Sequence, residues 1–377
     1  MLNETNVRLN EKMATLPRLS VSQGKGVVPS DSLNVNSMQA SNYEKYKIVQ
    51  PGHLVVNRFN AYKGALGRAP FRGIVSPDYF TGEINRSRSD DRYIEYFLRA
   101  KPTANLIERD MSGMGSGDPN SSAFSRFDVR SFLNLTIPVT DLQRQQRIAD
   151  YLDRETAEID AAVADLDRYV KLLEKRGKVL IEKTVNGGTY SFSPLWSKIR
   201  VQNGFAFDSE KFSPTKELPV AKIGNVLPGD FSEFIDASEL PSESFLIKDG
   251  DLVVGMSGDF NRTIWNKGKA ALNQRVCILK PIADDDIRYI NYAIGSGLKK
   301  IHSTKFSTTL KNLSTEEILA IRVPHRTVTE QKEIATYLDK ETAEINDLVV
   351  ESTRLRDLLL KRRSVLIAEV VTGRKQV

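Results

Sequence analysis

The chain has 377 residues, of which 40% are hydrophobic and 27% are charged, and its formal net charge at pH 7 is +6. This length predicts two to four domains, and the composition is that of a globular protein rather than a disordered one. A single cysteine, Cys277, excludes an internal disulfide and predicts a reducing compartment, which we expect to be the cytoplasm. The sequence holds no apolar run long enough to predict a membrane span.

Residues 1–139 predict a globular domain that mixes strands and helices. Runs such as LVVNRF and GIVSPDYF are β-branched and bounded by Gly, Pro or Asp, which is typical of strands, and RYIEYFLRA predicts a short helix. Basic side chains here lie among aromatic and amide residues, a pattern that favours contact with nucleic acid. The candidate contacts in this domain are Arg58, Lys63, Arg68 and Arg72.

Residues 140–188 predict one long helix of roughly 60 Å. Its apolar residues recur every seven positions, the pattern of a seam that packs against another helix. The seam residues are Leu152, Ile159, Leu166, Leu173 and Leu180. Asp141 suits the N-terminal cap of this helix, and Gly187 suits its C-terminal end.

Residues 189–324 predict a second globular domain of the same kind. DGDLVV at 249–254 is similar to PGHLVV at 51–56, and IRYINY at 287–292 is similar to DRYIEY at 91–96. Cys277 lies in the apolar run RVCILKP, so we expect it in the core. The candidate nucleic-acid contacts of this domain are Arg262, Lys267, Lys269, Arg275 and Lys305.

Residues 325–377 predict a second long helix that repeats the first. Residues 331–373 align with residues 145–187 without a gap, and 22 of the 43 positions are identical. Thr327 and Glu330 have the spacing of a capping box. The seam continues with Leu338, Ile345, Leu359 and Leu366, and Ser352 interrupts it. A repeat of this length predicts two equivalent units, each a globular segment followed by a long helix that packs on its copy.

The sequence holds no motif of an intrinsic enzyme. It lacks the phosphate-binding loop of an ATPase, and the glycine-rich run at 113–118 leads into more loop residues rather than a helix. One cysteine and three scattered histidines do not predict a metal site. We therefore expect no catalytic residue, no metal and no cofactor in this chain.

Two globular segments that alternate with two long helices carrying YLD-[RK]-ETAEI resemble one family, the specificity subunits of type I restriction-modification enzymes. The helices at 145–187 and 331–373 look like the central and C-terminal conserved regions of that family. GIVSP at 73–77 looks like target-recognition sequence. The first domain has 15 residues before its Leu-Pro pair, which is fewer than the second domain has before the equivalent pair. This short N-terminal stretch departs from the pattern of the family.

The resemblance implies an α+β fold in which two target-recognition domains are separated by an antiparallel coiled coil with pseudo-two-fold symmetry. It implies double-stranded DNA as the ligand, read as a bipartite asymmetric site with the helices as a ruler. The implied protein partners are two methyltransferase subunits and, through the complex, restriction subunits. S-adenosylmethionine, ATP and Mg²⁺ would then lie on those partners.

Two other interpretations stay open at this point. The chain could be an orphan or structural coiled-coil DNA-binding protein without restriction activity. It could also be a methyltransferase or nuclease with its own active site, although the missing motifs count against an enzyme.

Overall fold

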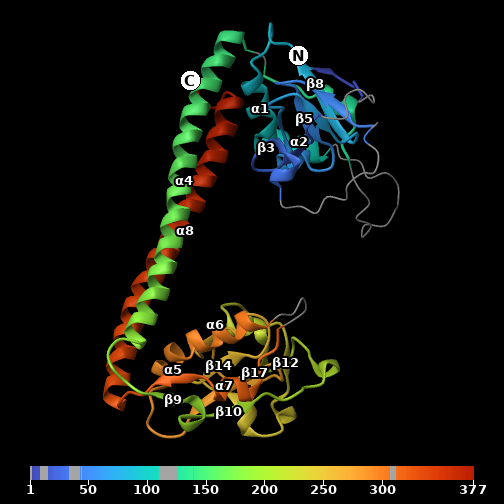
Figure 1. The fold of residues 1–377 in the computed structure, drawn as a ribbon. Helices are drawn as coiled ribbons and strands as arrows, with labels where there is room; N and C mark the ends of the chain where they lie inside the picture. Colours follow the sequence, from blue (N-terminus) through green and yellow to red (C-terminus); the bar gives the residue numbers. More distant parts are fainter. Residues whose placement is uncertain are drawn as a thin grey trace. The chain divides into compact units, whose positions relative to one another are not determined.

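The computed structural model describes residues 2–8, 16–33, 43, 45–109, 126–138, 140–305 and 311–377, so the glycine-rich run at 113–118 lies outside the described residues. The chain divides into two compact units, one made of Met1–Arg168 and Thr353–Val377 and the other of Tyr169–Ser352. Each unit joins a globular domain to parts of the two long helices α4 (Leu142–Val185) and α8 (Val328–Val371) (Figure 1).

The first unit contains eight short strands and three short helices among its described residues. Its strands are β1 (Leu2–Glu4), β2 (Leu19–Ser22), β3 (Gly26–Pro29), β4 (Lys47–Val49), β5 (Leu54–Asn57), β6 (Leu66–Arg68), β7 (Gly73–Val75) and β8 (Tyr79–Ile84). Its short helices are α1 (Asp91–Arg99), α2 (Lys101–Arg109) and α3 (Val129–Leu133). The strands predicted in LVVNRF and GIVSPDYF and the helix predicted in RYIEYFLRA are confirmed.

The second unit follows the same plan with more strands. These are β9 (Phe192–Pro194), β10 (Ile199–Asn203), β11 (Leu218–Ala221), β12 (Phe234–Ile235), β13 (Leu246–Ile247), β14 (Leu252–Gly255), β15 (Arg262–Ile264), β16 (Ala270–Leu272), β17 (Val276–Pro281) and β18 (Arg322–Pro324). Its short helices are α5 (Ile287–Ala293), α6 (Gly295–Thr304) and α7 (Thr315–Leu319).

One four-stranded antiparallel sheet occurs in both units with the same strand order. It runs β1-β8-β5-β6 in the first unit and β10-β17-β14-β15 in the second. The register also agrees, because Leu2 pairs with Ile84 in the first sheet and Ile199 pairs with Pro281 in the second. The strand β9 that precedes β10, and the buried Leu195 after it, have no counterpart among the described residues of the first unit.

The core of each unit is shared between the globular domain and the long helices. In the first unit, Phe80 and Tyr93 pack in one cluster with Leu152 of α4 and Val370 of α8. In the second, the cluster that holds Tyr289 also takes in Val185 and Leu338. Since each helix contributes to both cores, the compact units do not coincide with the four predicted segments at 1–139, 140–188, 189–324 and 325–377, and that division stays a prediction.

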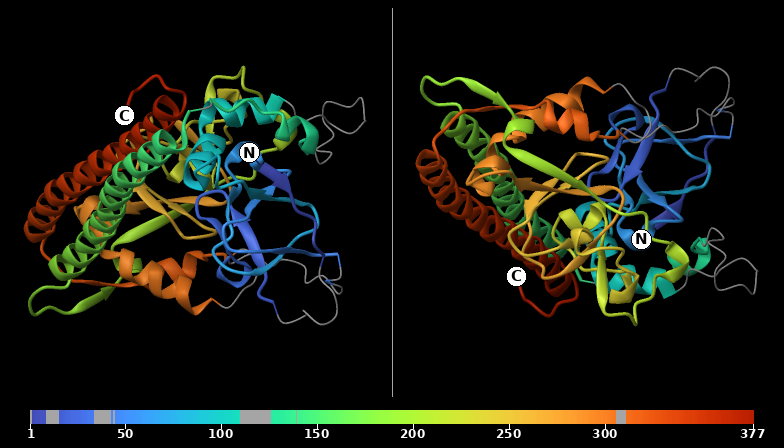
Figure 2. Two further views of the ribbon diagram at one scale, coloured as in Figure 1. Left: turned by 90° about the horizontal axis from the view of Figure 1, so that it is seen from above. Right: turned by 90° about the horizontal axis from the view of Figure 1, so that it is seen from below.

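The two long helices lie side by side in every view (Figure 2). In the first unit, Asp160 pairs with Arg363, and Asp167 further along α4 pairs with Arg356 earlier in α8. Because the residue numbers rise on one helix while they fall on the other, the pairing is antiparallel. The predicted α+β fold with a coiled coil of two long helices is confirmed.

The ends of the helices agree in part with their predicted caps. Asp141 accepts a hydrogen bond from the Arg144 N–H at 2.8 Å, and Thr327 and Glu330 form the predicted capping box. The end of α4 differs from the prediction, because Gly188 rather than Gly187 takes a positive φ, of 91°. Gly187 is needed for another reason, since a Cβ there would lie 2.8 Å from the Lys183 carbonyl oxygen.

Candidate nucleic-acid interface

In the first unit, two of the four predicted nucleic-acid contacts hold other parts of the chain in place. Arg58 donates from Nη2 to the Phe127 carbonyl at 2.8 Å, and burial lowers its pKa. Burial alone would lower the pKa of Arg68, but ion pairs with Glu95 and Asp91 outweigh it and raise the pKa above its ordinary value. These two guanidinium groups are therefore engaged before any ligand arrives.

The remaining two candidates of the first unit, Lys63 and Arg72, are exposed. Lys63 lies in a single turn of helix at Ala61–Lys63, with its ammonium 5.2 Å from the ring centre of Tyr62. An exposed lysine beside an aromatic ring can meet a phosphate without breaking an existing ion pair.

In the second unit, four of the five predicted contacts are also engaged with the chain itself. Lys267 donates to the carbonyls of Asn225 and Leu227 at 2.8 and 2.7 Å. Each of the other three has its own partner: Arg262 donates to the Asn291 carbonyl, Arg275 to Ser257, and Lys305 pairs with Glu317. The fifth, Lys269, is exposed, and no hydrogen bond or ion pair is found for its ammonium group in the described part of the chain.

Most of the candidate cations thus shape the loops of the two domains. Whether any of them touches DNA stays a prediction. Sequence alone could not separate the two roles, because an arginine that braces a loop and an arginine that binds a phosphate occur in similar surroundings.

A polar contact repeated in both units fixes each globular domain to a long helix. In the first unit, the Asp90 N–H at the start of α1 donates to Gln145 Oε1 of α4 at 3.0 Å. Arg92 donates to Asp153 at 2.8 Å, and the Tyr96 hydroxyl donates to the same carboxylate at 2.8 Å. We call this set of contacts, and its equivalent in the second unit, the latch.

The second unit repeats the latch with its own residues. The Asp286 N–H donates to Gln331 Oε1 at 2.8 Å. Arg288 and the Tyr292 hydroxyl both donate to Asp339 at 2.8 Å. The tyrosine hydroxyls also lie 3.2 Å from Thr156 Oγ1 in the first unit and from Thr342 Oγ1 in the second. The motif Asp-x-Arg-Tyr-x-x-Tyr on a short helix therefore contacts Gln, Asp and Thr of the duplicated long helix in both units, which gives the YLD-x-ET sequence a structural reason.

Several groups of the latch have pKa values shifted by their surroundings. Burial, with the hydrogen bond to Asp153, raises the pKa of Tyr96 to about 12, and the pKa of Tyr292 is raised to about 12 in the same way. Burial alone would raise the pKa of Asp286, but hydrogen bonds from Arg288 outweigh it and lower the pKa. At neutral pH the two tyrosines are therefore neutral donors, and Asp286 is a charged carboxylate.

Most of the predicted seam residues of the two long helices are covered by other parts of the chain. Six of the nine are buried: Leu152, Ile159, Leu173, Leu338, Ile345 and Leu366. Leu166, Leu180 and Leu359 are half-buried. Ser352 is itself buried at the seam and donates its hydroxyl to the Leu348 carbonyl, so the break in the heptad is filled by a satisfied polar group.

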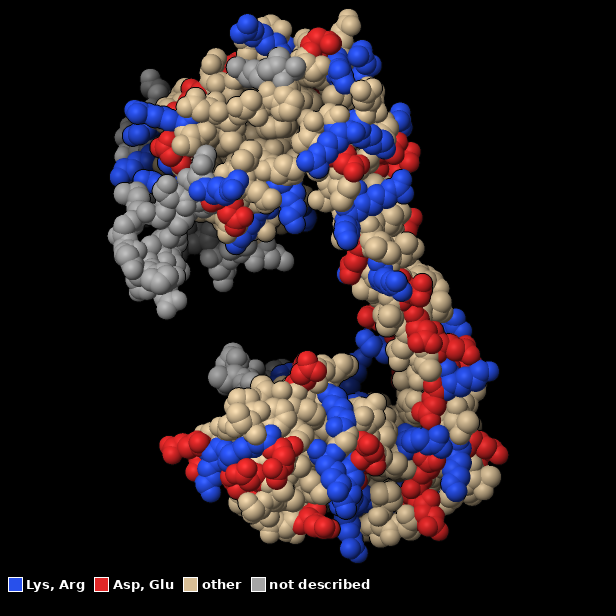
Figure 3. Space-filling model, turned by 180° about the vertical axis from the view of Figure 1, so that it is seen from behind, with Lys and Arg blue, Asp and Glu red and all other residues tan. Residues whose placement is uncertain are grey.

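The outer faces of the helices carry an apolar stripe in duplicate. Leu172 is 57% exposed and its repeat Leu358 is 54% exposed. The neighbouring positions repeat in the same way, with Tyr169 and Val179 on α4 and Leu355 and Val365 on α8. On the face of the helices shown in Figure 3, basic and acidic side chains are interspersed, so the helices present no surface of one charge there.

Other kinds of site are not seen in the described part of the chain. No cluster of three or more metal-ligating side chains occurs there, and none of the described helices combines the length and hydropathy of a membrane span. Cys277 is fully buried as predicted, and burial raises its pKa to about 12, so its thiol is protonated.

Two comparisons of the sequence with known proteins match part of this chain. A family model described as the type I restriction modification DNA specificity domain matches residues 197–350, which lie within the second unit. The type I restriction enzyme EcoBI specificity subunit of Escherichia coli is 34% identical over 205 residues, which make up 52% of this chain and 43% of that protein. This chain thus matches less than half the length of that relative.

Two solved structures share the fold over nearly the whole chain. One comes from work on complex assembly and conformational transition of the type I R-M system, with a TM-score of 0.74, 11% identity, and coverage of 98% of this chain and 97% of the other. The other is the HsdS subunit from Thermoanaerobacter tengcongensis, with a TM-score of 0.51, 13% identity, and coverage of 99% and 97%. The resemblance predicted from the duplicated helix is confirmed.

Proposed function

We propose that this chain, which carries a type I restriction modification DNA specificity domain at residues 197–350, is the subunit that gives such a complex its DNA sequence specificity. Each globular domain would read one half of a bipartite site in double-stranded DNA. The observation that carries the proposal is the repeated sheet and latch, which set two domains on the helices in equivalent ways. Because the loops of the two domains differ in sequence, the two half-sites should differ as well.

The chain would supply recognition and leave the chemistry to its partners. The duplicated apolar stripe supports two copies of one protein partner, since Leu172 and Leu358 offer the same surface twice. We assign these two positions to methyltransferase subunits, which would carry S-adenosylmethionine. Restriction subunits would join through that complex with ATP and Mg²⁺.

The first test is methylation mapping of the source genome with the gene intact and with the gene deleted. We expect one asymmetric bipartite motif to lose its methylation on deletion. Two variants then test the contributions of the two domains one at a time. One replaces the loop between β5 and β6, and the other replaces the loop between β14 and β15. Each should change one half of the motif and leave the other half intact. An unchanged methylation pattern in all three strains would contradict the proposal.

The partner assignment has its own test in the stoichiometry of the complex. Leu172→Glu should remove one methyltransferase subunit, Leu358→Glu the other, and the double variant both, as measured by the mass of the purified assembly. Release of both subunits by Leu358→Glu alone would contradict two independent docking positions. Retention of both subunits by the double variant would place the docking surface elsewhere.

A further inference from the structure

The first unit contains a cleft between its globular domain and the long helices. Its volume is about 1010 Å³, and it is lined by the turn between β2 and β3, by the helical turn at Ala61–Lys63, by α1 and α2, and by α4 and α8. Seven basic and four acidic side chains line it. The cleft therefore has an excess of positive charge.

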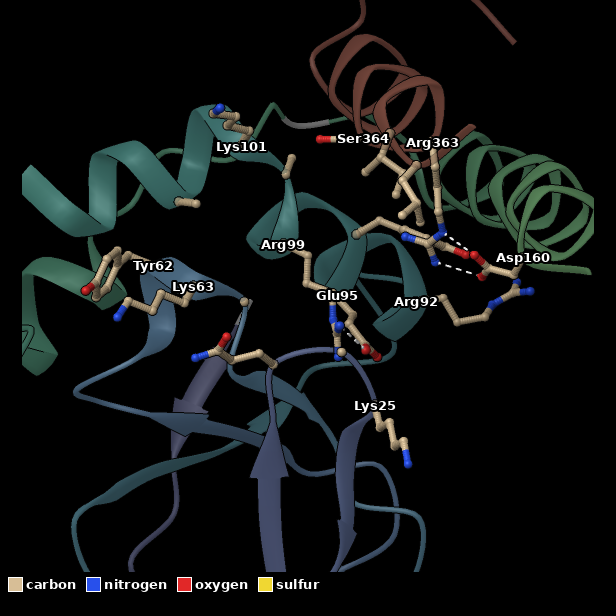
Figure 4. Close-up of a pocket in the computed structure, with 18 of the residues that line it drawn as sticks. Lys25, Tyr62, Lys63, Arg92, Glu95, Arg99, Lys101, Asp160, Arg363 and Ser364 are labelled. Atoms are coloured by element: carbon tan, nitrogen blue, oxygen red, sulfur yellow. Dashed lines mark hydrogen bonds and ion pairs between the residues drawn. The ribbon is translucent and has the colours of Figure 1, made fainter. Parts of the chain in front are cut away.

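The arginines of the cleft are held by the acidic side chains. Arg99 pairs with Glu95 at 3.1 Å, and Arg363 of α8 pairs with Asp160 of α4 at 2.8 Å. Figure 4 shows both pairs, with Arg363 and Asp160 joining the two long helices. Arg92 is held in the latch. These pairs fix the wall of the cleft and largely cancel its fixed charges.

Three lysines lie around these pairs on three separate elements: Lys25 in the turn after β2, Lys63 in the short helical turn, and Lys101 at the start of α2 (Figure 4). All three are exposed. In the described part of the chain, none of them has a hydrogen bond or ion pair from its ammonium group, and Lys63 has only its contact with the Tyr62 ring. The uncompensated charge of the cleft is the charge of these lysines.

We propose that Lys25, Lys63 and Lys101 bind the phosphates of the DNA backbone and so position the first domain on the duplex. This inference rests on the proposed function and adds a backbone-positioning site to it. A lysine is a compact cation on a flexible stem that suits phosphate, and phosphate contacts fix register without reading sequence. A duplex presents one negative charge per roughly 1.7 Å of its axis, so it can meet cations that stand on separate elements at once.

An acidic segment of a protein partner is the main competing occupant. The lining favours DNA over it, because the cleft offers charged groups and few free apolar anchors. Leu360 and Ile367 are the only large aliphatic side chains among its described lining residues. Its two aromatic residues are already engaged, Tyr62 with the Lys63 ammonium and Tyr96 in the latch. A protein contact of this size would be expected to centre on buried aromatic or aliphatic groups.

The test compares two triple variants of the full chain that remove the same charge. One carries Lys25→Ala, Lys63→Ala and Lys101→Ala. The control carries Lys183→Ala, Lys332→Ala and Lys340→Ala, three exposed lysines of the long helices away from the cleft and from the apolar stripe. Binding of a fluorescent duplex of random sequence is measured over a range of salt concentrations. The cleft variant should bind the duplex about tenfold more weakly. Its plot of log affinity against log salt concentration should be shallower than that of the wild type, by about 3 in slope, while the control keeps the wild-type slope.

A second measurement uses the methyltransferase complex in cells. Since phosphate contacts carry no sequence information, the cleft variant should methylate the same motif but a smaller fraction of its copies. Equal weakening in both triple variants would mean that only net charge matters and would overturn the site. A cleft variant that keeps its DNA affinity and loses methyltransferase subunits would assign the cleft to protein docking instead. Failure of the wild-type chain to bind any duplex, both alone and with its methyltransferase subunits, would overturn the proposed function and this inference together.

Discussion

The latch predicts that removing one carboxylate will loosen one unit and not the other. Asp339→Ala takes away an ion pair to Arg288 and the acceptor of the Tyr292 hydroxyl, both at 2.8 Å. The ion pair is about two-fifths exposed, so screening leaves it about 0.5–1 kcal/mol. The hydrogen bond to a charged acceptor adds about 1–2 kcal/mol. We therefore expect the second unit to lose about 2 kcal/mol of unfolding free energy.

The two tryptophans give an assay that reports on the second unit alone. Trp196 and Trp265 both lie in that unit, and they are the only tryptophans of the chain. Trp265 is 1% exposed, whereas Trp196 is 62% exposed, so a Trp196→Phe background leaves one buried reporter. Thermal unfolding followed by Trp265 fluorescence should shift down by roughly 4–8 °C in Asp339→Ala.

The matched control is Asp153→Ala in the first unit. It removes the same pair of contacts, and it leaves Arg92 bound to Asp150 at 2.7 Å. The Trp265 transition should move much less in this variant, and a first-unit transition seen by circular dichroism should move instead. Equal shifts of the Trp265 transition in both variants, or no shift in Asp339→Ala, would refute the reasoning.

Three further predictions concern the helices and the sheet. Gly177→Ala should raise the free energy of unfolding, measured by urea titration, by about 0.5–1 kcal/mol, because alanine favours the helical backbone more than glycine does. The added Cβ would meet only the Ile345 side chain, at 3.8 Å. A loss of stability would mean that the two helices pack more tightly there. Gly73→Ala should destabilise the first unit, since a Cβ would lie 2.7 Å from the Pro17 carbonyl oxygen, and an unchanged circular-dichroism melt would contradict that approach. The raised pKa of Tyr292 favours its neutral form in the fold, so its stabilising contribution is present below pH 10 and is lost as the pH rises towards about 12. Tyr292→Phe should flatten this alkaline loss, and an identical pH profile would show that the hydroxyl does not titrate as described.

The sequence predicted the long helices well because their signals are local. A seven-residue apolar period and a gapless repeat define a helix and its buried stripe without knowledge of any distant contact. The strands at Leu54–Asn57 and Leu252–Gly255 were predictable for the same reason, since β-branched runs between turn residues are short-range patterns.

The latch could not be predicted in the same way, because its partners are far apart along the chain. The similarity of DRYIEY and IRYINY was visible, but nothing local says that Tyr96 meets Asp153. A usable signal was present in the repeat itself, since Asp-x-Arg-Tyr-x-x-Tyr and YLD-x-ET are both duplicated. Lys25 and Lys101 were missed because neither lies in a stretch dense in basic residues, and only the fold brings them near Lys63.

The latch also has a consequence for how the two globular domains can vary. Tyr96 and Asp153 are 57 residues apart, whereas Tyr292 and Asp339 are 47 apart, and both pairs close the same contact. By loop-closure entropy the longer connection costs only about 0.2 kcal/mol more. Segments inserted between the short helix and the long helix therefore cost very little free energy of unfolding, so this stretch can change in length and sequence while the contact of the domain with the helix stays the same.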